Sequence, residues 1–329
     1  MHQIQEFENK IKKLKLSILF FSILTALLAI LCLLHIWQVY PTHADKVSIT
    51  TSPLLDPELN QYPREDMILN IQPLRESLIK LEDKYKNETE ISLYLEVLNT
   101  GANISINKEM RIWPVSLTKL PTVMAVIKNS EIGKIDLNDT LKISEDDLNS
   151  DSGELYKLGA GHQLSVEDAI KIMLHDSDNT AYNALKSITT EEDLNSVLNS
   201  VGLGEIFKSD GSVSAKEYNR LLRSIYSGVY LSRKNSAYLI EIMTNTTFND
   251  FLSQGIPKNI KFAHKWGGGY REKIYADAGI VYTPNRPYMI TVMIKGKDHL
   301  STDESATLAK QIFKEISTTT TTYIINYHP

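Results

Sequence analysis

The sequence predicts an α/β fold of the α+β type, built on a five-stranded antiparallel sheet. A helical pattern and two strand patterns open the folded part of the chain, and three strand patterns and a helix close it. Short turns join the strands at both ends, which favours antiparallel pairing with the N- and C-terminal helices packed on the sheet. The middle, about residues 114–252, is predicted to be an inserted all-helical subdomain.

The opening elements follow from local patterns. Pro73 stands at the first position of a helix whose apolar residues recur at helical spacing. Residues 91–98 alternate as a strand, and a turn at 99–101 leads into a returning strand at 102–107. These segments predict a helix followed by a β-hairpin.

The closing strands are predicted at residues 261–266, 278–282 and 288–294. Three glycines at 267–269 are expected to join the first two strands, and a Pro-Asn-Arg-Pro turn at 284–287 is expected to join the last two. Both connections are short enough for hairpins.

Two capping signals mark helix starts. Ser165 precedes Asp168 by three residues, and Ser301 precedes Glu304 by the same interval. In each case apolar residues then recur on one helical face, so we expect one helix inside the subdomain and one at the C-terminus. The threonine-rich segment 318–329 is expected to be a frayed tail.

Composition narrows the function classes. The 329 residues are 42% hydrophobic and 23% charged, as in an ordinary globular protein, and the formal net charge is −5. Without a basic excess, nucleic acid is not expected as the main partner. Cys32 is the only cysteine, so the chain can form no internal disulfide, and the histidines show no ligand spacing. We therefore expect no metal and no cofactor.

The N-terminal region predicts a membrane anchor. Residues 16–39 contain no charged residue and are long enough to cross a hydrocarbon core of about 30 Å. Four lysines lie between residues 10 and 15, which favours a cytoplasmic N-terminus and an exported remainder. A cleaved signal peptide, cut near residues 42–44, is the alternative, and it also exports the rest.

The expected organisation follows from these boundaries. It comprises a cytoplasmic tail (1–15), a single-pass transmembrane anchor (16–39), an extracytoplasmic linker (40–71), a folded domain (72–317) and a tail (318–329).

One short motif that can support nucleophilic catalysis occurs three times. Ser-x-x-Lys on a helix places an amine one turn from a hydroxyl, which the amine can activate. Two copies, at Ser77 and Ser105, are most simply solvated surface. The third, Ser116 with Lys119, follows Trp113-Pro114 and opens an apolar helical segment, where a helix N-terminus favours negative charge.

Two further motifs follow in order. Ser177-Asp178-Asn179 comes directly after the helix that Ser165 caps, and Lys265-Trp266-Gly267 lies on a predicted strand. Each is weak alone, as a polar helix end or a strand turn. Together, Ser-x-x-Lys, Ser-x-Asn and Lys-x-Gly form the signature of serine β-lactamases and penicillin-binding proteins.

The chain thus resembles the class A β-lactamase-like serine hydrolases over about residues 72–317, and the resemblance implies a β-lactamase/transpeptidase-like fold. By the family pattern Ser116 is the acylated nucleophile and Lys119 accepts its proton. Ser177 relays a proton to the leaving nitrogen, and Asn179 holds Lys119 and the substrate amide.

The third motif completes the implied site. Lys265 supplies positive potential for a substrate carboxylate. The backbone N–H groups of Ser116 and Gly268 form the oxyanion hole, with Gly267 and Trp266 beside the substrate.

Two departures from the family pattern bear on activity. Trp266 replaces a hydroxyl residue that helps to bind a carboxylate, and its bulk is expected to point away from the site. The interval from Ser177 to Lys265 is 88 residues, which is short for the loop that carries the deacylating glutamate. Glu205 is the acid that remains in that neighbourhood, and a surface glutamate is the simpler interpretation.

These features predict a membrane-anchored, extracytoplasmic serine hydrolase with slow deacylation and a monomeric catalytic domain. Its expected partner is a β-lactam or a peptidoglycan peptide. A D-alanyl-D-alanine carboxypeptidase of the penicillin-binding type, or a β-lactam-binding module without turnover, is the alternative. An enzyme of the same fold that acts on esters or other amides, and a structural envelope protein with decayed motifs, are further possibilities.

Overall fold

The computed structural model describes residues 12–13, 15–16, 18–19, 22–23, 25, 55, 69–204 and 211–328. The chain divides into two compact units, residues 1–51 and 52–329, and the fold below is that of the second. In the described part of the chain no helix is long and apolar enough to cross a membrane. The predicted span at 16–39 falls mostly on residues outside that part.

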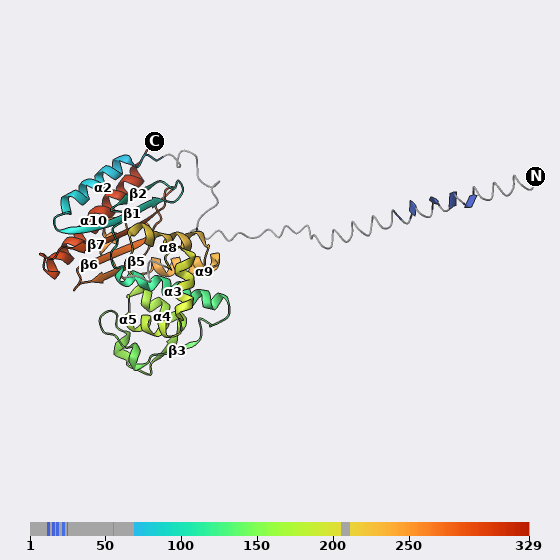
Figure 1. Ribbon diagram of the computed structural model, residues 1–329, viewed down its shortest axis with the longest axis horizontal. Coiled ribbons are helices and arrows are strands. Elements are labelled where there is room, and N and C mark those ends of the chain that lie inside the picture. Colours follow the sequence, from blue (N-terminus) through green and yellow to red (C-terminus); the bar gives the residue numbers. More distant parts are fainter. Residues whose placement is uncertain are drawn as a thin grey trace, which may run out of the picture. The chain divides into compact units, whose positions relative to one another are not determined.

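The centre of the second unit is an antiparallel sheet of five strands in the order β2-β1-β7-β6-β5 (Figure 1). The strands are β1 (Thr89–Val97), β2 (Asn103–Ile106), β5 (Phe262–Gly269), β6 (Ile274–Val281) and β7 (Tyr288–Gly296). The predicted five-stranded antiparallel sheet is confirmed. Strand β5 forms one edge of it, and Gly268 pairs in register with Tyr275 of β6.

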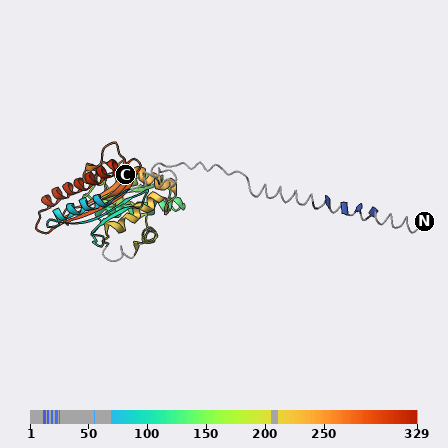
Figure 2. The same ribbon diagram turned by 90° about the horizontal axis from the view of Figure 1, so that it is seen from above.

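One face of the sheet is covered by the terminal helices α2 (Gln72–Tyr85) and α10 (Thr302–Asn326), which lie side by side (Figure 2). The prediction of a frayed tail from residue 318 is wrong, because α10 continues through the threonines to Asn326. Thr320, Thr321 and Ile324 are buried there, so tertiary packing overrides the low helix propensity of threonine.

The other face carries the helical subdomain. Its helices are α3 (Lys119–Glu131), α4 (Val166–His175), α5 (Asn179–Ser187), α6 (Glu191–Ser200), α8 (Ala215–Ser227) and α9 (Arg233–Thr244). A two-stranded sheet, β3 (Thr140–Lys142) with β4 (Gln163–Ser165), lies within it. Short 3-10 helices link these elements: η3 (Val115–Thr118), η4 (Glu145–Asp147), η5 (Leu155–Leu158) and η6 (Phe251–Gly255).

Both capping predictions are confirmed. The Ser165 hydroxyl accepts the Asp168 N–H at 2.9 Å, and Ser301 forms a reciprocal capping box with Glu304. Each cap satisfies amide groups that the first helical turn leaves without an intrahelical partner.

The hydrophobic core has two parts, one on each face of the sheet. The larger includes the apolar residues of α3 from Leu120 to Ile127, and Leu55 also belongs to it. Leu55 lies within the predicted linker (40–71), so this residue packs in the core of the folded unit.

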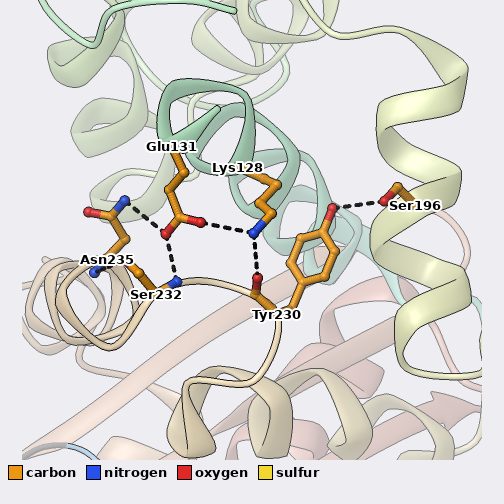
Figure 3. A network of polar contacts seen from close by, with 6 residues as sticks. All are labelled: Lys128, Glu131, Ser196, Tyr230, Ser232 and Asn235. Carbon is orange, nitrogen blue, oxygen red and sulfur yellow. Dashed lines mark hydrogen bonds and ion pairs between the residues drawn. The ribbon is translucent and has the colours of Figure 1, made fainter. Parts of the chain in front are cut away.

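A polar network ties the end of α3 to the start of α9 (Figure 3). Glu131 accepts from the Ser232 N–H at 2.6 Å, from Asn235 at 3.0 Å and from Lys128 at 3.0 Å. Lys128 also donates to the Tyr230 carbonyl at 2.9 Å. Burial raises the pKa of Glu131, but these hydrogen bonds outweigh burial, and the net pKa is lowered. The network therefore holds a charged carboxylate between two helices of the subdomain.

Candidate active site

The Ser116 hydroxyl is presented by a tight turn. Ser116 lies in η3, one turn before α3 begins at Lys119, and it is half-buried. Its neighbour Val115 has a φ of 45°, a left-handed conformation that is unusual for a β-branched residue. The Tyr218 hydroxyl donates to the Leu117 carbonyl at 2.9 Å from the core side. The turn is thus strained and held by packing, as at many functional sites.

Strand β5 passes directly behind this turn. A Cβ placed on Gly267 would lie 2.7 Å from the Ser116 backbone nitrogen and 2.6 Å from a Val115 methyl. Only glycine allows so close an approach. The prediction that residues 267–269 form a connection is therefore wrong: the glycines are the last residues of β5, and the turn follows them.

The second motif lies between α4 and α5. Ser177 is 1% exposed and has a φ of 56°. The next residue, Asp178, caps α5 by accepting the Ala181 N–H at 2.8 Å, and its other oxygen accepts the Leu155 N–H at 2.9 Å. These two bonds fix the loop that carries Ser177.

Lys119 joins the first motif to the second. Its ammonium donates to the Ser177 hydroxyl at 3.1 Å, to the Ser177 carbonyl, and to the Asn179 side-chain oxygen at 2.7 Å. Burial lowers the pKa of Lys119 to about 8, with a partial opposing effect from the Asp178 carboxylate. A substantial fraction of Lys119 is therefore neutral near physiological pH.

Lys265 brings a second buried cation to the same region. It is 1% exposed and donates to the Trp266 carbonyl at 2.9 Å. Burial, followed by the charge of Lys119, lowers the pKa of Lys265 well below its usual range. An anion in the neighbouring cleft would favour the charged form of Lys265.

These elements surround one cleft of about 660 Å³. Of the residues predicted from the sequence, Ser116, Ser177, Asn179, Trp266 and Gly268 line it. The two lysines are buried behind these residues, and Gly267 contacts Ser116. Glu205 lies outside the described residues.

Trp266 packs against aromatic residues of the core and also lines the cleft. Its ring stacks on Phe248 at a centroid distance of 3.8 Å and meets Phe251 edge-on at 6.3 Å. Its indole nitrogen is buried and has no hydrogen-bond partner in the described part of the protein. Most of the ring is thus a component of the hydrophobic core beneath α10, although part of the residue lines the cleft.

Several site residues carry no sequence signal of their own. Asn149 accepts from the Asn179 amide at 3.0 Å and so orients the side chain that holds Lys119. Arg271 and Glu272, in the turn after β5, line the cleft. These residues lie in loops, where neither periodicity nor motif marks them. Within the described ranges, no cluster of metal-ligating side chains occurs.

A family model described as "Beta-lactamase enzyme family" matches residues 73–324. The chain is 24% identical to beta-lactamase VEB-1 of Pseudomonas aeruginosa over a match of 274 residues, with 75% of this chain and 90% of that protein covered.

Solved structures are similar over most of the chain. PBP-A is 22% identical, with a TM-score of 0.68, over 78% of this chain and 97% of its own. A PBP-A mutant, an acyl-enzyme complex with penicillin G, gives a TM-score of 0.69 at 22% identity over 78% and 98%. The TLA-1 extended-spectrum β-lactamase gives 0.66 at 18% identity over 76% and 99%. These likenesses confirm the predicted fold.

Proposed function

This chain belongs to the beta-lactamase enzyme family, as a class A β-lactamase-like serine hydrolase, and we propose that it cleaves an amide through an acyl-enzyme on Ser116. The substrate is a β-lactam or a cell-wall peptide. Lys119 lies one turn from Ser116 and donates hydrogen bonds to both Ser177 and Asn179. This position of Lys119 is the main support for the proposal. The relatives named as β-lactamases and the penicillin G acyl-enzyme of PBP-A support this substrate class.

The first chemical step uses the neutral fraction of Lys119. The Ser116 oxygen attacks the amide carbonyl carbon, and Lys119 takes the hydroxyl proton. The amide C–N bond then breaks, and Ser177 passes a proton to the leaving nitrogen. The proton comes from Lys119, with which the Ser177 hydroxyl shares a 3.1 Å hydrogen bond.

The negative charge that develops on the substrate's carbonyl oxygen needs hydrogen-bond donors. The backbone N–H groups of Ser116 and Gly268 supply them in this proposal, since β5 runs against the Ser116 turn. The edge position of β5 supports this role, because an edge strand leaves alternate N–H groups unpaired by the sheet.

A substrate carboxylate is recognised by Arg271, and Lys265 adds positive potential from behind the residues that line the cleft. Trp266 has no hydroxyl for this task, and its ring is held by Phe248. Arg271 is exposed and lines the cleft, where its guanidinium can bind a carboxylate through two parallel hydrogen bonds.

Deacylation is slow in this proposal. None of the described residues in 180–204 and 211–265 lines the cleft, so that part of the chain presents no carboxylate to a water there. The carboxylates that do line the cleft, Asp151 and Glu272, lie outside this interval. Glu205 remains the candidate base in this interval. Gly211, six residues later in the sequence, lies against Trp113, which lines the cleft.

The proposal is tested by assaying benzylpenicillin turnover and D-alanine release from a peptide ending in D-alanyl-D-alanine. Both activities should disappear in Ser116→Ala. The matched control is Ser105→Ala, which alters another Ser-x-x-Lys copy, on β2. The Ser105 hydroxyl is buried rather than solvated as predicted, and it has no partner among the described residues. Activity that survives in Ser116→Ala would remove Ser116 as the nucleophile. D-alanine release with only stoichiometric penicillin loss would select the peptidase alternative.

Membrane attachment is part of the same proposal. The uncharged segment 16–39 and the lysines before it support an uncleaved anchor with the catalytic unit outside. The full chain should stay in the membrane pellet after alkaline carbonate washing, whereas a chain beginning at Ser52 should be released. Release of both chains would contradict the anchor.

A further inference from the structure

A second constellation of chemically competent side chains lies on the other side of strand β5 from Lys265. His264 Nδ1 is 2.8 Å from the Asp277 carboxylate, and His264 Nε2 is 3.3 Å from the Ser253 hydroxyl. These contacts connect η6, β5 and β6. From them we infer a second nucleophilic site, a Ser253–His264–Asp277 triad that hydrolyses esters bearing a negative charge.

The hydrogen bonds orient the imidazole for this role. Asp277 is fully buried, and its second oxygen accepts the Leu252 N–H at 3.1 Å, so the carboxylate is fixed from two sides. A carboxylate only accepts hydrogen bonds, which assigns the proton to Nδ1 of His264. Nε2 is then the acceptor that faces Ser253. Serine hydrolases on unrelated folds use this same arrangement, in several chain orders.

The site opens into its own cavity. Ser253 and His264 line a cavity of about 920 Å³, and no residue lines both this cavity and the cleft at Ser116. Ser253 is half-buried, whereas His264 is 2% exposed and is stacked on Phe262 at 4.1 Å. The base is thus shielded from bulk water, and the hydroxyl remains within reach of a substrate.

The lining indicates the substrate class. Lys258 and Lys261 line the cavity, and none of its described lining residues is acidic, although Lys261 is also 4.0 Å from the Glu241 carboxylate. Phe248, Ile256 and Phe262 supply apolar surface beside them. A short acyl ester with one carboxylate fits this combination of a hydrophobic wall and positive charge.

The reaction balances without a cofactor. The Ser253 oxygen bonds to the acyl carbon while its proton moves to His264 Nε2. The ester C–O bond breaks, and the leaving oxygen takes that proton. Water then repeats the sequence on the acyl-Ser253 ester and releases the carboxylic acid. Asp277 acts as a positioning residue through His264.

The test uses the full-length chain with Ser116→Ala, which removes the first nucleophile, and a fluorophosphonate probe followed by peptide mapping. We expect the label on Ser253. Ser253→Ala should abolish labelling, and His264→Gln should slow it at least about 100-fold. Ser236→Ala is the matched control, because this buried serine on α9 lines neither cavity, and labelling should stay unchanged.

Ester hydrolysis gives an independent readout in the same background. Mono-4-nitrophenyl succinate should be hydrolysed faster than 4-nitrophenyl acetate, and Lys258→Glu should reverse that order. Asp277→Asn should lower kcat with KM unchanged, which a purely structural effect on the cavity would not produce.

The Ser116→Ala chain keeps the Ser253–His264–Asp277 triad intact, so it tests for a second nucleophile even if the triad variants unfold. If this chain melts at the same temperature as the native chain and Ser253 is not labelled, the proposal is overturned. Labelling of a folded His264→Gln variant at the rate of the Ser116→Ala chain also overturns it. A preference for the neutral ester overturns the assigned substrate class.

Discussion

Gly267 of strand β5 lies directly against Ser116, so closely that a Cβ on Gly267 would lie 2.7 Å from the Ser116 nitrogen. The Ser116 nitrogen belongs to the backbone of a strained turn, so it cannot yield as the end of a flexible side chain would. The nucleophile is therefore held directly against strand β5, which also lines the cleft.

Gly267→Ala should displace the Ser116 turn and slow acylation by benzylpenicillin at least about 100-fold. Gly269→Ala is the matched control, since its Cβ would meet the Glu272 side chain at 3.0 Å and a Val115 methyl at 3.1 Å. Those atoms can shift, so acylation should change less than about threefold. Comparable losses in the two variants would contradict the role assigned to the contact.

Acylation should accelerate with pH because Lys119 acts in its neutral form. Burial lowers the pKa of Lys119 to about 8, so the neutral fraction falls as the pH drops below that value. The second-order rate constant for acylation should fall about tenfold per pH unit well below 8 and level off above it. A flat profile between pH 6 and pH 9 would be incompatible with Lys119 as the base.

Much of this site could be predicted from the sequence because its chemistry is tied to local elements. Ser116, Lys119 and Ser177 lie where their motifs and the neighbouring helices place them. The end of β5 could not be predicted, because consecutive glycines normally mark turns. The tight packing that requires Gly267 is a tertiary contact with Ser116, which is distant in sequence.

Contacts made by loops and within the core could not be predicted from the sequence for the same reason. Asn149 acts through Asn179, thirty residues away, and no local pattern links the two. The stack of Trp266 on Phe248 joins a strand to a loop after α9. The buried face of α10 shows that threonines continue a helix once tertiary packing compensates for their propensity.

Trp266 is expected to affect both the stability of the fold and the recognition of a substrate carboxylate, and the two effects can be measured separately. Trp266→Thr removes the stack on Phe248 and should lower the free energy of unfolding by about 3 kcal/mol. Trp266→Phe keeps the stack and removes a buried N–H that has no partner in the described structure, so it should cost less than about 1.5 kcal/mol. Denaturant unfolding of the two variants measures this. Equal stability would show that the stack contributes little.

The missing hydroxyl at Trp266 can be assessed in the same Trp266→Thr variant. If that hydroxyl limits carboxylate binding, the folded fraction should acylate faster with benzylpenicillin than the native chain does. An unchanged rate would mean that Lys265 and Arg271 already suffice.

Arg271 and Glu272 should have opposite effects on anionic substrates, because both line the cleft with opposite charges. Arg271→Ala should raise KM for benzylpenicillin about fivefold, and Glu272→Gln should lower it. Steady-state or acylation kinetics at low and high salt measure both, and high salt should shrink both effects. Shifts of the same sign in the two variants would exclude an electrostatic role.

Intact mass spectrometry tests most directly whether Ser116 forms an acyl-enzyme that deacylates slowly. The full-length chain, Ser116→Ala and Ser105→Ala are mixed with benzylpenicillin, and their masses are followed over time. A persistent adduct of one penicillin on the native chain and on Ser105→Ala, absent from Ser116→Ala, is the predicted result. Rapid penicillin consumption without a lasting adduct would contradict slow deacylation and direct attention to Glu205. Neither adduct nor consumption would contradict the β-lactam chemistry itself.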